Sequence, residues 1–382
     1  MKECRNKNEE VALRLLPLDA LRGIAAFGVA FFWHYKALFQ SNDISSFPLP
    51  MIGYWFYTYG WHLVDLFFVL SGFVFMYKYS RKIIDKKISL KEFSLLRLTR
   101  LYPLYAITLL IVFIVQIGRY VVLDSFFVYQ YNDIYHFLLN IFFLQSNFKL
   151  ETGYSLNAPS WSICSEIIAY IFFFIILIKY NKNYLLYFFL SIILSLIVII
   201  KQIEIPFLNY YTARALLGFF VGCFVFKIND YVANNKKIAY YCFILLVFVT
   251  FIGILKGQNV FGNWPIVYVT LVYPLIIFSI LNITFLKYFL SLQIFVFLGT
   301  ISYSIYLWHF PVQLIVKTFD DLFAIGIVYE SLLIQVLIIS LTLIISYVSY
   351  EYFEKRYMNI LRKKFITTAK YTHHAIELHK TK

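Results

Sequence analysis

The stretch "LDALRGIAAFGVAFFWHY", residues 18–35, has the composition of a helix that crosses a membrane. Its residues are almost all apolar, yet Arg22 stands near its start and His34 near its end. An ionisable side chain inside a membrane span costs about 2.5 kcal/mol or more, and such a residue usually has a function. The composition of the whole chain indicates the class of protein in which these two residues lie.

The chain has 382 residues, of which 61% are hydrophobic and only 14% are charged. Soluble domains have about 25% charged residues. Long apolar runs recur along the whole chain, and each is close to the roughly 20 residues that a spanning helix needs. The sequence therefore predicts an all-α, multi-pass membrane helix bundle. Ten spans are expected, at 18–39, 60–79, 98–118, 161–179, 185–201, 208–227, 238–255, 265–282, 294–316 and 328–350.

The connections between spans leave no room for a separate soluble domain. Segment 133–146 is apolar but too short to span, so we expect an interfacial or re-entrant helix there. The longest outer connection, 119–160, is too short and too apolar for a folded domain. We expect three parts: a cytoplasmic tail over 1–17, a transmembrane domain over 18–350 and a basic cytoplasmic tail over 351–382.

The net charge of +14 could indicate nucleic-acid binding, but its distribution indicates a membrane instead. The 34 Lys and Arg residues concentrate in tails and loops that lie on the inner side if the N-terminus is inside. Cytoplasmic loops carry such an excess of Lys and Arg. We therefore expect an inner-membrane protein with both termini in the cytoplasm and no nucleic-acid partner.

Neither a metal site nor a bound cofactor is predicted. The four cysteines are scattered and show neither zinc-ligand spacing nor a disulfide framework. The pair His373–His374 in the basic tail is too isolated to indicate a metal site.

Several polar residues inside the spans fall at two depths. A helix rises about 1.5 Å per residue, which places His34 about 18 Å beyond Arg22, in the outer half of the membrane. Four titratable residues are expected at this outer depth: His34, Asp65, Glu166 and His309. Each alone could be a packing or capping residue. Polar groups at membrane depth must pair or face water, so their shared depth favours one common cavity.

Five stretches carry a resemblance to a known family. They are "LDALRGIAA" followed by His34, "VDLFFVLSGF" (64–73), "RLTRLYPLY" (97–105), "PSWSICSE" (159–166) and "SYSIYLWHFP" (302–311). In this order they resemble the motifs of the membrane acyltransferase-3 family, whose members O-acetylate bacterial surface polysaccharides. The likeness extends from about residue 14 to residue 350.

The resemblance implies ten spans, an acyl-CoA donor taken from the cytoplasm and a hydroxyl acceptor outside. The expected acceptor is a surface glycan or lipid-linked saccharide, such as O-antigen, capsule or exopolysaccharide, and the expected donor is acetyl-CoA. Transfer of succinyl or another acyl group is the alternative within this class. A transporter or flippase is the alternative outside it, but it predicts internal repeats with paired broken helices, which we do not find.

The inner arginines suit the donor. Arginine binds phosphate through a planar fork that donates two parallel hydrogen bonds and stays charged. Arg97 and Arg100 are three residues apart and share a helix face. We expect these two, with Arg22, to bind the nucleotide end of acetyl-CoA, although Arg97 and Arg100 could instead be topology anchors.

The outer residues suit proton transfer. A sugar hydroxyl is a poor nucleophile, and a neutral histidine can take its proton during attack, so His34 is the expected general base. Asp65 or Glu166 could orient its ring, as the acid does in a serine–histidine triad. The sequence does not decide which groups donate hydrogen bonds to the oxyanion. The remaining site candidates are Ser302, Tyr303 and His309 as oxyanion donors and Arg214 within a span.

The spacing of Arg22 and His34 departs from the family pattern. Eleven residues separate them, where the family usually has ten. Twelve steps of about 100° would place them about 120° apart around the helix. A π-bulge, which is often found at functional sites, would absorb the extra residue, and we favour it. Alternatively, Asp19 could pair with Arg22 and make Arg22 structural.

Overall fold

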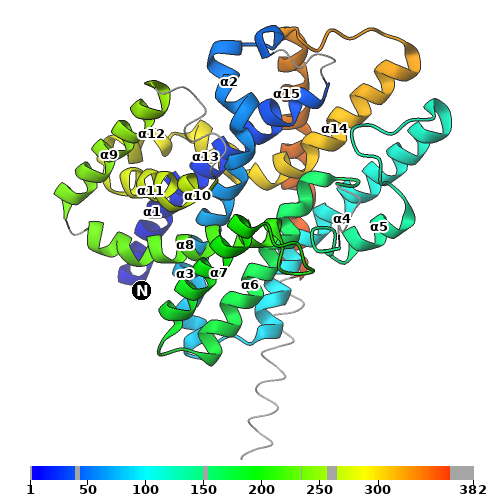
Figure 1. The fold of residues 1–382 in the computed structure, drawn as a ribbon. Helices are drawn as coiled ribbons and strands as arrows, with labels where there is room; N and C mark the ends of the chain where they lie inside the picture. The colour runs from blue at the N-terminus through cyan, green and yellow to red at the C-terminus, as the bar shows by residue number, and fades with distance from the viewer. Residues whose placement is uncertain (1, 39–43, 149–153, 234, 256–264, 362–382) are drawn as a thin grey trace, which may run out of the picture.

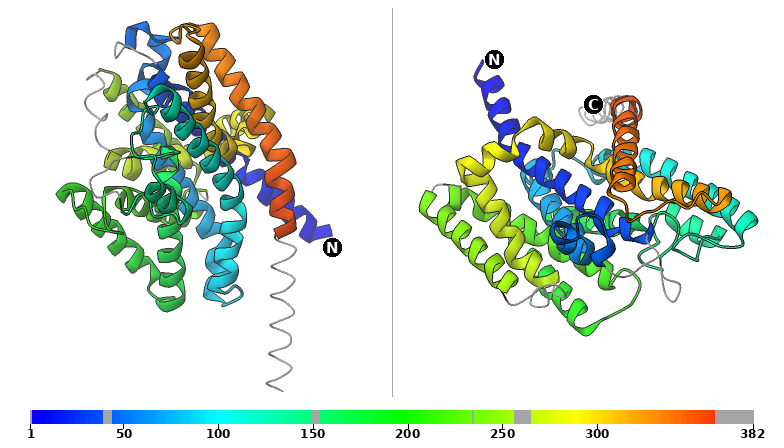
Figure 2. Two further views of the ribbon diagram at one scale, coloured as in Figure 1. Left: turned by 90° about the vertical axis from the view of Figure 1, so that its right-hand side faces the viewer. Right: turned by 90° about the horizontal axis from the view of Figure 1, so that it is seen from above.

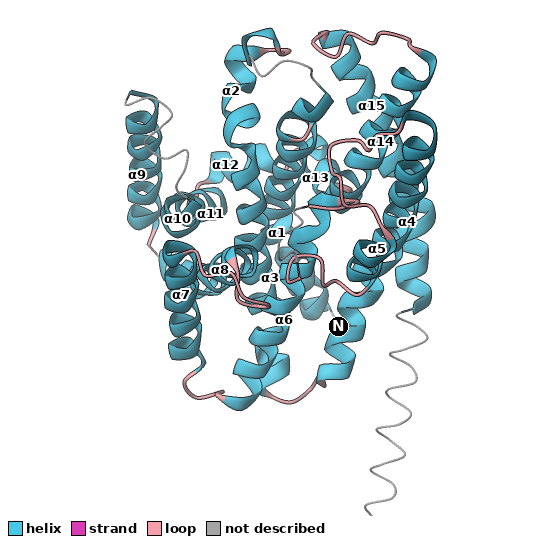
Figure 3. Cartoon of the chain, turned by 45° about the vertical axis from the view of Figure 1, so that its right-hand side comes forward, coloured by secondary structure: helices cyan, strands magenta, loops and turns pink. Residues whose placement is uncertain are grey.

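The computed structural model is helical throughout the part of the chain that it describes (Figure 1). The described ranges are 2–38, 44–148, 154–233, 235–255 and 265–361. Within them, Figure 3 shows helices joined by loops and no strand, and one isolated bridge joins Ile205 and Leu208. The predicted all-α class is confirmed.

The α-helices are α1 (Lys2–Gly28), α2 (Pro50–Tyr59), α3 (Leu63–Ile84), α4 (Leu90–Leu123), α5 (Ile134–Ile141), α6 (Trp161–Lys179), α7 (Tyr184–Lys201), α8 (Tyr210–Ala233), α9 (Lys236–Leu255), α10 (Pro265–Val267), α11 (Tyr273–Asn282), α12 (Thr284–Leu290), α13 (Gln293–Thr300), α14 (Ser302–Phe323) and α15 (Leu332–Val348). The π-helices are η1 (Val29–Trp33), η6 (Tyr268–Val272) and η7 (Ser349–Glu354). The 3-10 turns are η2 (Tyr35–Leu38), η3 (Ile44–Ser46), η4 (Gly60–His62) and η5 (Ala158–Ser160).

Eight helical segments of the described ranges are long and apolar enough to cross a membrane. They are Leu15–Leu38, Gly53–Ile84, Leu90–Leu123, Ala158–Lys179, Tyr184–Lys201, Tyr210–Ala233, Pro265–Asn282 and Leu332–Leu361. A ninth candidate is the pair α13 and α14, which bends by 65° between its helices. These nine coincide with nine of the ten predicted spans.

One predicted span lies partly outside the described side chains, and another is longer than predicted. The tenth predicted span, 238–255, corresponds to α9, and the side chains at the end of α9 lie outside the described part of the chain. The last span runs on to Leu361, past the predicted end of the transmembrane domain at 350, and Figure 2 shows it as a long orange helix along one side of the bundle. Residues 362–382 of the predicted tail lie outside the described ranges.

Glycines set the closest helix contacts, and these fix the helices that carry the site. A Cβ atom at Gly72 of α3 would lie 1.8 Å from the Phe219 carbonyl oxygen of α8, so the two backbones touch there. A Cβ atom at Gly299 of α13 would lie 2.2 Å from the Asp19 carbonyl oxygen of α1. Small residues at membrane helix interfaces allow this close approach. The first span is thereby held against the bend before α14.

The short helix α5 covers the centre of segment 133–146 and is too short to span, as predicted. Asp133 caps it by accepting the His136 backbone N–H at 2.9 Å. Asn140 faces inward and is fully buried, whereas Ile134 and Leu138 are exposed. One side of α5 therefore packs on the bundle, and Figure 1 shows it beside α4.

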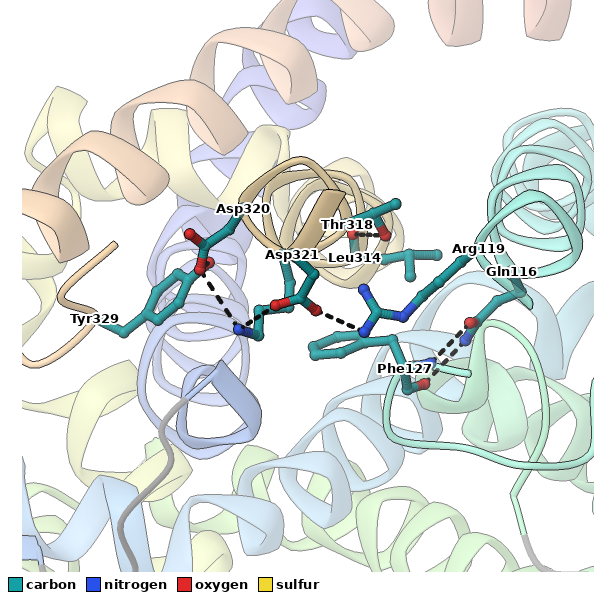
Figure 4. Close-up of polar contacts among 9 residues, drawn as sticks. Gln116, Arg119, Phe127, Leu314, Thr318, Asp320, Asp321 and Tyr329 are labelled. Atoms are coloured by element: carbon teal, nitrogen blue, oxygen red, sulfur yellow. Dashed lines mark hydrogen bonds and ion pairs between the residues drawn. The ribbon is translucent and has the colours of Figure 1, made fainter. Parts of the chain in front are cut away.

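A polar cluster joins the C-terminal ends of α4 and α14 (Figure 4). Arg119 of α4 donates from Nη2 to Asp321 of α14 at 2.6 Å. Gln116 pairs with both backbone groups of Phe127, at 3.0 Å to its N–H and 2.9 Å to its carbonyl. The cluster fixes α14, which carries His309, against α4.

Candidate active site

The first span changes its helical type just before His34. The α-helical part ends at Gly28, and the next five residues, Val29–Trp33, form the π-helix η1. The His34 backbone N–H donates to the Val29 carbonyl, five residues back, at 2.9 Å. The predicted π-bulge is confirmed, and it absorbs the extra residue between Arg22 and His34 at a place typical of functional sites.

The ion pair between Asp19 and Arg22 is present as well. Arg22 Nη1 lies 3.1 Å from Asp19 Oδ1, one turn earlier on the same helix. Arg22 nevertheless lines a cavity inside the bundle, described below. The pair and the π-bulge are therefore not alternatives, because Asp19 holds the guanidinium at the cavity and does not withdraw it.

His34 and His309 form a direct pair between the first span and α14. His34 Nδ1 lies 2.7 Å from His309 Nε2. The ring planes are within 4° of parallel, and the centroids are 4.8 Å apart. The two nitrogen atoms are within hydrogen-bond distance while the ring centroids are 4.8 Å apart. The two rings therefore meet edge to edge in one plane and are joined by a hydrogen bond. His309 is fully buried, whereas His34 is partly exposed to the cavity that it lines.

A backbone carbonyl sets the tautomers of this pair. His309 Nδ1 lies 3.2 Å from the Ile305 carbonyl oxygen, which can only accept, so Nδ1 of the neutral ring carries the proton. His309 Nε2 must then accept, and His34 Nδ1 must donate. His34 Nε2 is left with a free lone pair and has no hydrogen-bond partner among the described residues. A neutral imidazole in this form can accept a proton.

Four cations and one carboxylate line a cavity of about 170 Å³ beside α3, which we call the inner cavity after the predicted orientation. The cations are Arg22, Lys78, Arg97 and Arg100, and the carboxylate is Glu166. The cavity is therefore strongly cationic. Arg22, Arg97 and Arg100 line this cavity together, and Lys78 of α3 joins them.

Glu166 does not lie beside His34, contrary to the expectation of one common cavity. Its neighbours along one face of α6, Ser162, Ile163 and Tyr170, also line the inner cavity. Residues three and four apart share a helix face, so the rotation of α6 turns Glu166 toward the arginines. The depth of a residue along its helix does not give the direction of its side chain, so depth alone could not predict this arrangement.

The start of α4, the helix that carries Arg97 and Arg100, is stabilised by a cap. Ser89 Oγ accepts the Glu92 backbone N–H at 3.2 Å, and Glu92 accepts the Ser89 backbone N–H at 2.8 Å, which forms a capping box. Two turns later, Arg97 donates to the Tyr79 hydroxyl and packs over the Phe75 ring at 4.8 Å. Its Nε is buried without a partner among the described residues, so it can still donate to a bound group.

A second cavity, the outer cavity, lies at the other end of α3 and has a volume of about 760 Å³. Aromatic side chains dominate its lining. His34 lies in this lining together with two cations, Lys36 and Arg214. No carboxylate stands among the described residues that line it. The imidazole pair thus belongs to the outer cavity, and the arginine cluster belongs to the inner cavity.

The two cavities come within one helical turn of each other on α3. Val64 lines the outer cavity and Phe67 the inner cavity, and three residues of helix rise about 4.5 Å. Phe67 packs edge-on against Tyr306, with 5.7 Å between ring centroids. The Tyr306 hydroxyl donates to the Pro159 carbonyl at 2.6 Å and contacts Ser162 Oγ at 2.9 Å. We call Phe67, Ser162 and Tyr306 the partition.

Comparison with known proteins identifies the family to which the chain belongs. The sequence profile of an acyltransferase domain matches residues 16–351, which is most of the chain. The chain belongs to this acyltransferase family. Because its helices are long and apolar enough to cross a membrane, it is a membrane acyltransferase.

Two relatives are similar to this chain, and one of them is named as an acetyltransferase. A protein of Acidianus two-tailed virus named "Putative acetyltransferase ORF330" is 24% identical over 319 residues, which cover 81% of this chain and 87% of the viral protein. "Protein 2 in picA locus" of Rhizobium radiobacter is 28% identical over 166 residues, which cover 41% of this chain and 78% of the relative. No solved structure gives a significant match.

In this acyltransferase, Asp65 pairs with Arg214 and not with His34. Arg214 Nε and Nη2 donate to the two carboxylate oxygens of Asp65 at 2.9 and 3.1 Å. Both side chains are buried, and the guanidinium packs over the rings of Trp61 and Trp161 at 4.9 and 5.1 Å. The side chain that contacts the His34 ring in the structure is His309, not Asp65.

The two hydroxyl candidates for an oxyanion site have other partners. Ser302 Oγ donates to the Gly299 carbonyl at 2.8 Å, where the chain bends between α13 and α14. Tyr303 donates to the Leu101 carbonyl at 2.5 Å and so ties α14 to α4. Both residues line the inner cavity of the acyltransferase, but each hydroxyl has only one proton to donate.

Sequence reasoning missed three lining residues. Lys78 was not among the predicted site residues, although it lies on the same helix as Asp65, 13 residues later. Lys36 and Tyr306 received no role, although each stands within three residues of His34 or His309. That closeness in sequence is the signal that could have found them. His373 and His374 lie outside the described part of the acyltransferase.

Proposed function

We propose that this acyltransferase moves an acetyl group from cytoplasmic acetyl-CoA to a hydroxyl of an extracytoplasmic surface glycan. O-antigen, capsule and exopolysaccharide are the acceptors in view. The protein would lie in the inner membrane with both termini in the cytoplasm. The observation that carries this proposal is the His34–His309 pair, which stands beside the partition that closes a cationic inner cavity.

The inner cavity suits the donor because acetyl-CoA has several phosphate charges at one end. Arg22, Arg97, Arg100 and Lys78 oppose the single lining carboxylate Glu166, so the lining has an excess of positive charge. Guanidinium groups match phosphate oxygens with two parallel hydrogen bonds. We assign the nucleotide end of the donor to these cations, with Glu166 as the acid that shares their cavity.

The length of the inner cavity suits the thin arm of the donor. It follows α3 from Tyr79 to Phe67, twelve residues that rise about 18 Å. An arm laid along this path brings the thioester to the partition. The Tyr306 ring there lies 5.9 Å from the His309 ring, measured between centroids. Donor and base then lie on opposite sides of one layer of side chains, which must open for transfer.

The proposed reaction is a single acyl transfer. The acceptor hydroxyl attacks the thioester carbonyl carbon while His34 Nε2 takes its proton, so a C–O bond forms as the proton leaves. The C–S bond then breaks, and the CoA thiolate takes up the proton. His309 accepts the Nδ1–H of His34 throughout, which holds the ring and supports the imidazolium.

The outer cavity suits a saccharide acceptor in size and lining. Its volume of about 760 Å³ lies within the roughly 300–1,000 Å³ of small-molecule sites. Aromatic walls can pack against the apolar C–H faces of sugar rings, while polar groups bind the hydroxyls. A glycan segment bound here would present a hydroxyl to His34 at the cavity wall.

Two measurements test the proposal. Mass spectrometry of surface glycans from cells with and without the gene should show acetyl groups that depend on the gene. Purified protein in lipid nanodiscs should transfer label from acetyl-CoA to that glycan. Unchanged glycan acetylation in the deletion strain, together with label transfer only to lipid or protein, would overturn the glycan acceptor.

A further inference from the structure

Lys36 is a cation in the wall of the outer cavity, and it has no counter-ion among the described residues. Its Nζ lies 3.2 Å from the ring centroid of Trp33, and both residues line the cavity. No carboxylate of the described residues forms an ion pair with Lys36, whereas Lys317 and Lys355 each have an acidic partner. An aromatic face attracts an ammonium group and fixes its place without neutralising it.

The other cation of the outer cavity is already neutralised. Arg214 uses Nε and Nη2 on the two oxygens of Asp65, which is completely buried. One edge of its planar fork is therefore occupied, and its charge is balanced by the Asp65 carboxylate. Among the described residues that line the outer cavity, Lys36 is then the cation without a paired carboxylate, and it stands among aromatic rings.

We infer that the outer cavity selects an acidic saccharide, whose carboxylate pairs with Lys36 while one of its hydroxyls reaches His34. This inference rests on the proposed function, because it specifies the acceptor of the same site. An ammonium is a compact point charge, which suits a single carboxylate, whereas phosphate recognition favours the arginine fork. Lys36 stands two residues after His34, so a sugar carboxylate bound to Lys36 places the sugar beside the base.

A binding titration tests this without relying on catalysis. The protein in nanodiscs is titrated with a disaccharide that contains glucuronic acid and with its carboxyl-reduced, neutral counterpart. Binding is followed by the fluorescence of the tryptophans that line the cavity, Trp33, Trp61 and Trp161. We expect the acidic disaccharide to bind about tenfold more tightly, as one partly buried ion pair would give.

Lys36→Gln should abolish this preference while leaving neutral binding in place, and Lys36→Arg should retain it. The matched control is Lys201→Gln, a substitution at an exposed lysine that lines neither cavity, which should keep the full preference. Equal affinity of the wild type for the two disaccharides would overturn the inference and leave acetyl transfer untouched. A preference that survives Lys36→Gln would also overturn it.

Discussion

The inner and outer cavities lie along the same helix, α3, but they hold their charges in opposite ways. The inner cavity collects four cations around one carboxylate, and Arg97 has a buried nitrogen without a hydrogen-bond partner among the described residues. In the described lining of the outer cavity, the guanidinium of Arg214 is bound by both oxygens of Asp65, and His34 pairs with His309 behind the wall. Most of the unpaired positive charge is therefore at the inner end, whereas the outer end has the single ammonium of Lys36 beside a histidine pair with fixed tautomers.

This difference separates two tasks that a transferase must perform. Binding a phosphate-rich donor needs strong, permanent positive charge, which arginine supplies. Accepting a proton needs a neutral base, and a cluster of several uncompensated cations nearby would oppose its protonation. The partition of Phe67, Ser162 and Tyr306 lies between the two environments. The comparison predicts that substitutions on the two sides change different steps.

The largest effect is expected at His34. His34→Ala should reduce acetyl transfer by about 10²–10⁴-fold, because a positioned general base contributes about that much. Acetyl-CoA affinity should stay within about twofold, since the inner cavity is unchanged. Transfer of label and binding of donor are measured on the same protein preparation.

His309→Ala serves as the matched control on the same pair. It removes the partner of His34 Nδ1 but leaves a base, so transfer should fall less than in His34→Ala. Near-normal transfer by correctly inserted His34→Ala protein would remove the general-base assignment and make His309 the next candidate.

The next effect concerns stability and compares the two buried acids. Asp65→Asn should destabilise the protein by about 3–5 kcal/mol, because it leaves Arg214 as an uncompensated buried charge. Glu166→Gln should cost less, because Glu166 faces a cavity and has no ion-pair partner within 4.0 Å among the described residues. Thermal or denaturant unfolding in detergent compares the two variants.

The double variant Asp65→Asn with Arg214→Gln sharpens this test. Removing both charges should recover part of the lost stability, since the unpaired charge is the cost. If Glu166→Gln destabilised the protein more than Asp65→Asn, the assignment of Asp65 to structure and Glu166 to the donor side would have to be reversed.

A smaller effect is expected at the donor end. Arg97→Ala should weaken acetyl-CoA binding by about 10–100-fold, which corresponds to the roughly 1.5–3 kcal/mol of hydrogen bonds to a charged group. Arg97→Lys should restore only part of the affinity, because an ammonium lacks the fork. Isothermal titration of nanodisc protein gives both values.

Arg81→Ala is the control for this prediction, because Arg81 is exposed near the end of α3 and lines neither cavity. Donor affinity should not change in that variant. Unchanged affinity in Arg97→Ala as well would make Arg97 and its neighbours topology anchors and would leave the donor site unassigned.

The sequence was sufficient for the helical class, for nine of the spans in the described ranges and for the axial position of the key residues. Arg22 and His34 could be placed by counting helical rise, and their spacing indicated the π-helix that η1 forms. These properties are local, because composition, helical rise and residue spacing can be read along one segment at a time.

The pairing of the outer residues could not be predicted in the same way. Asp65, Glu166 and His309 were expected together because they share a depth, but depth does not give the direction in which each side chain points. That direction depends on how the helices pack, for example on the backbone contact at Gly72. The partner of His34 is therefore His309, and Asp65 is bound to Arg214 from a distant part of the chain.

The most direct test of the division between the cavities supplies donor and acceptor on opposite faces of a membrane. The protein is reconstituted into vesicles, and a labelled cysteine at Lys355, an exposed residue near the inner-cavity end of the bundle, assigns the faces. We predict acetylation of the saccharide only when acetyl-CoA is on the Lys355 face and the saccharide is on the other, and its loss in His34→Ala. Equal acetylation when the two substrates exchange faces would contradict the account.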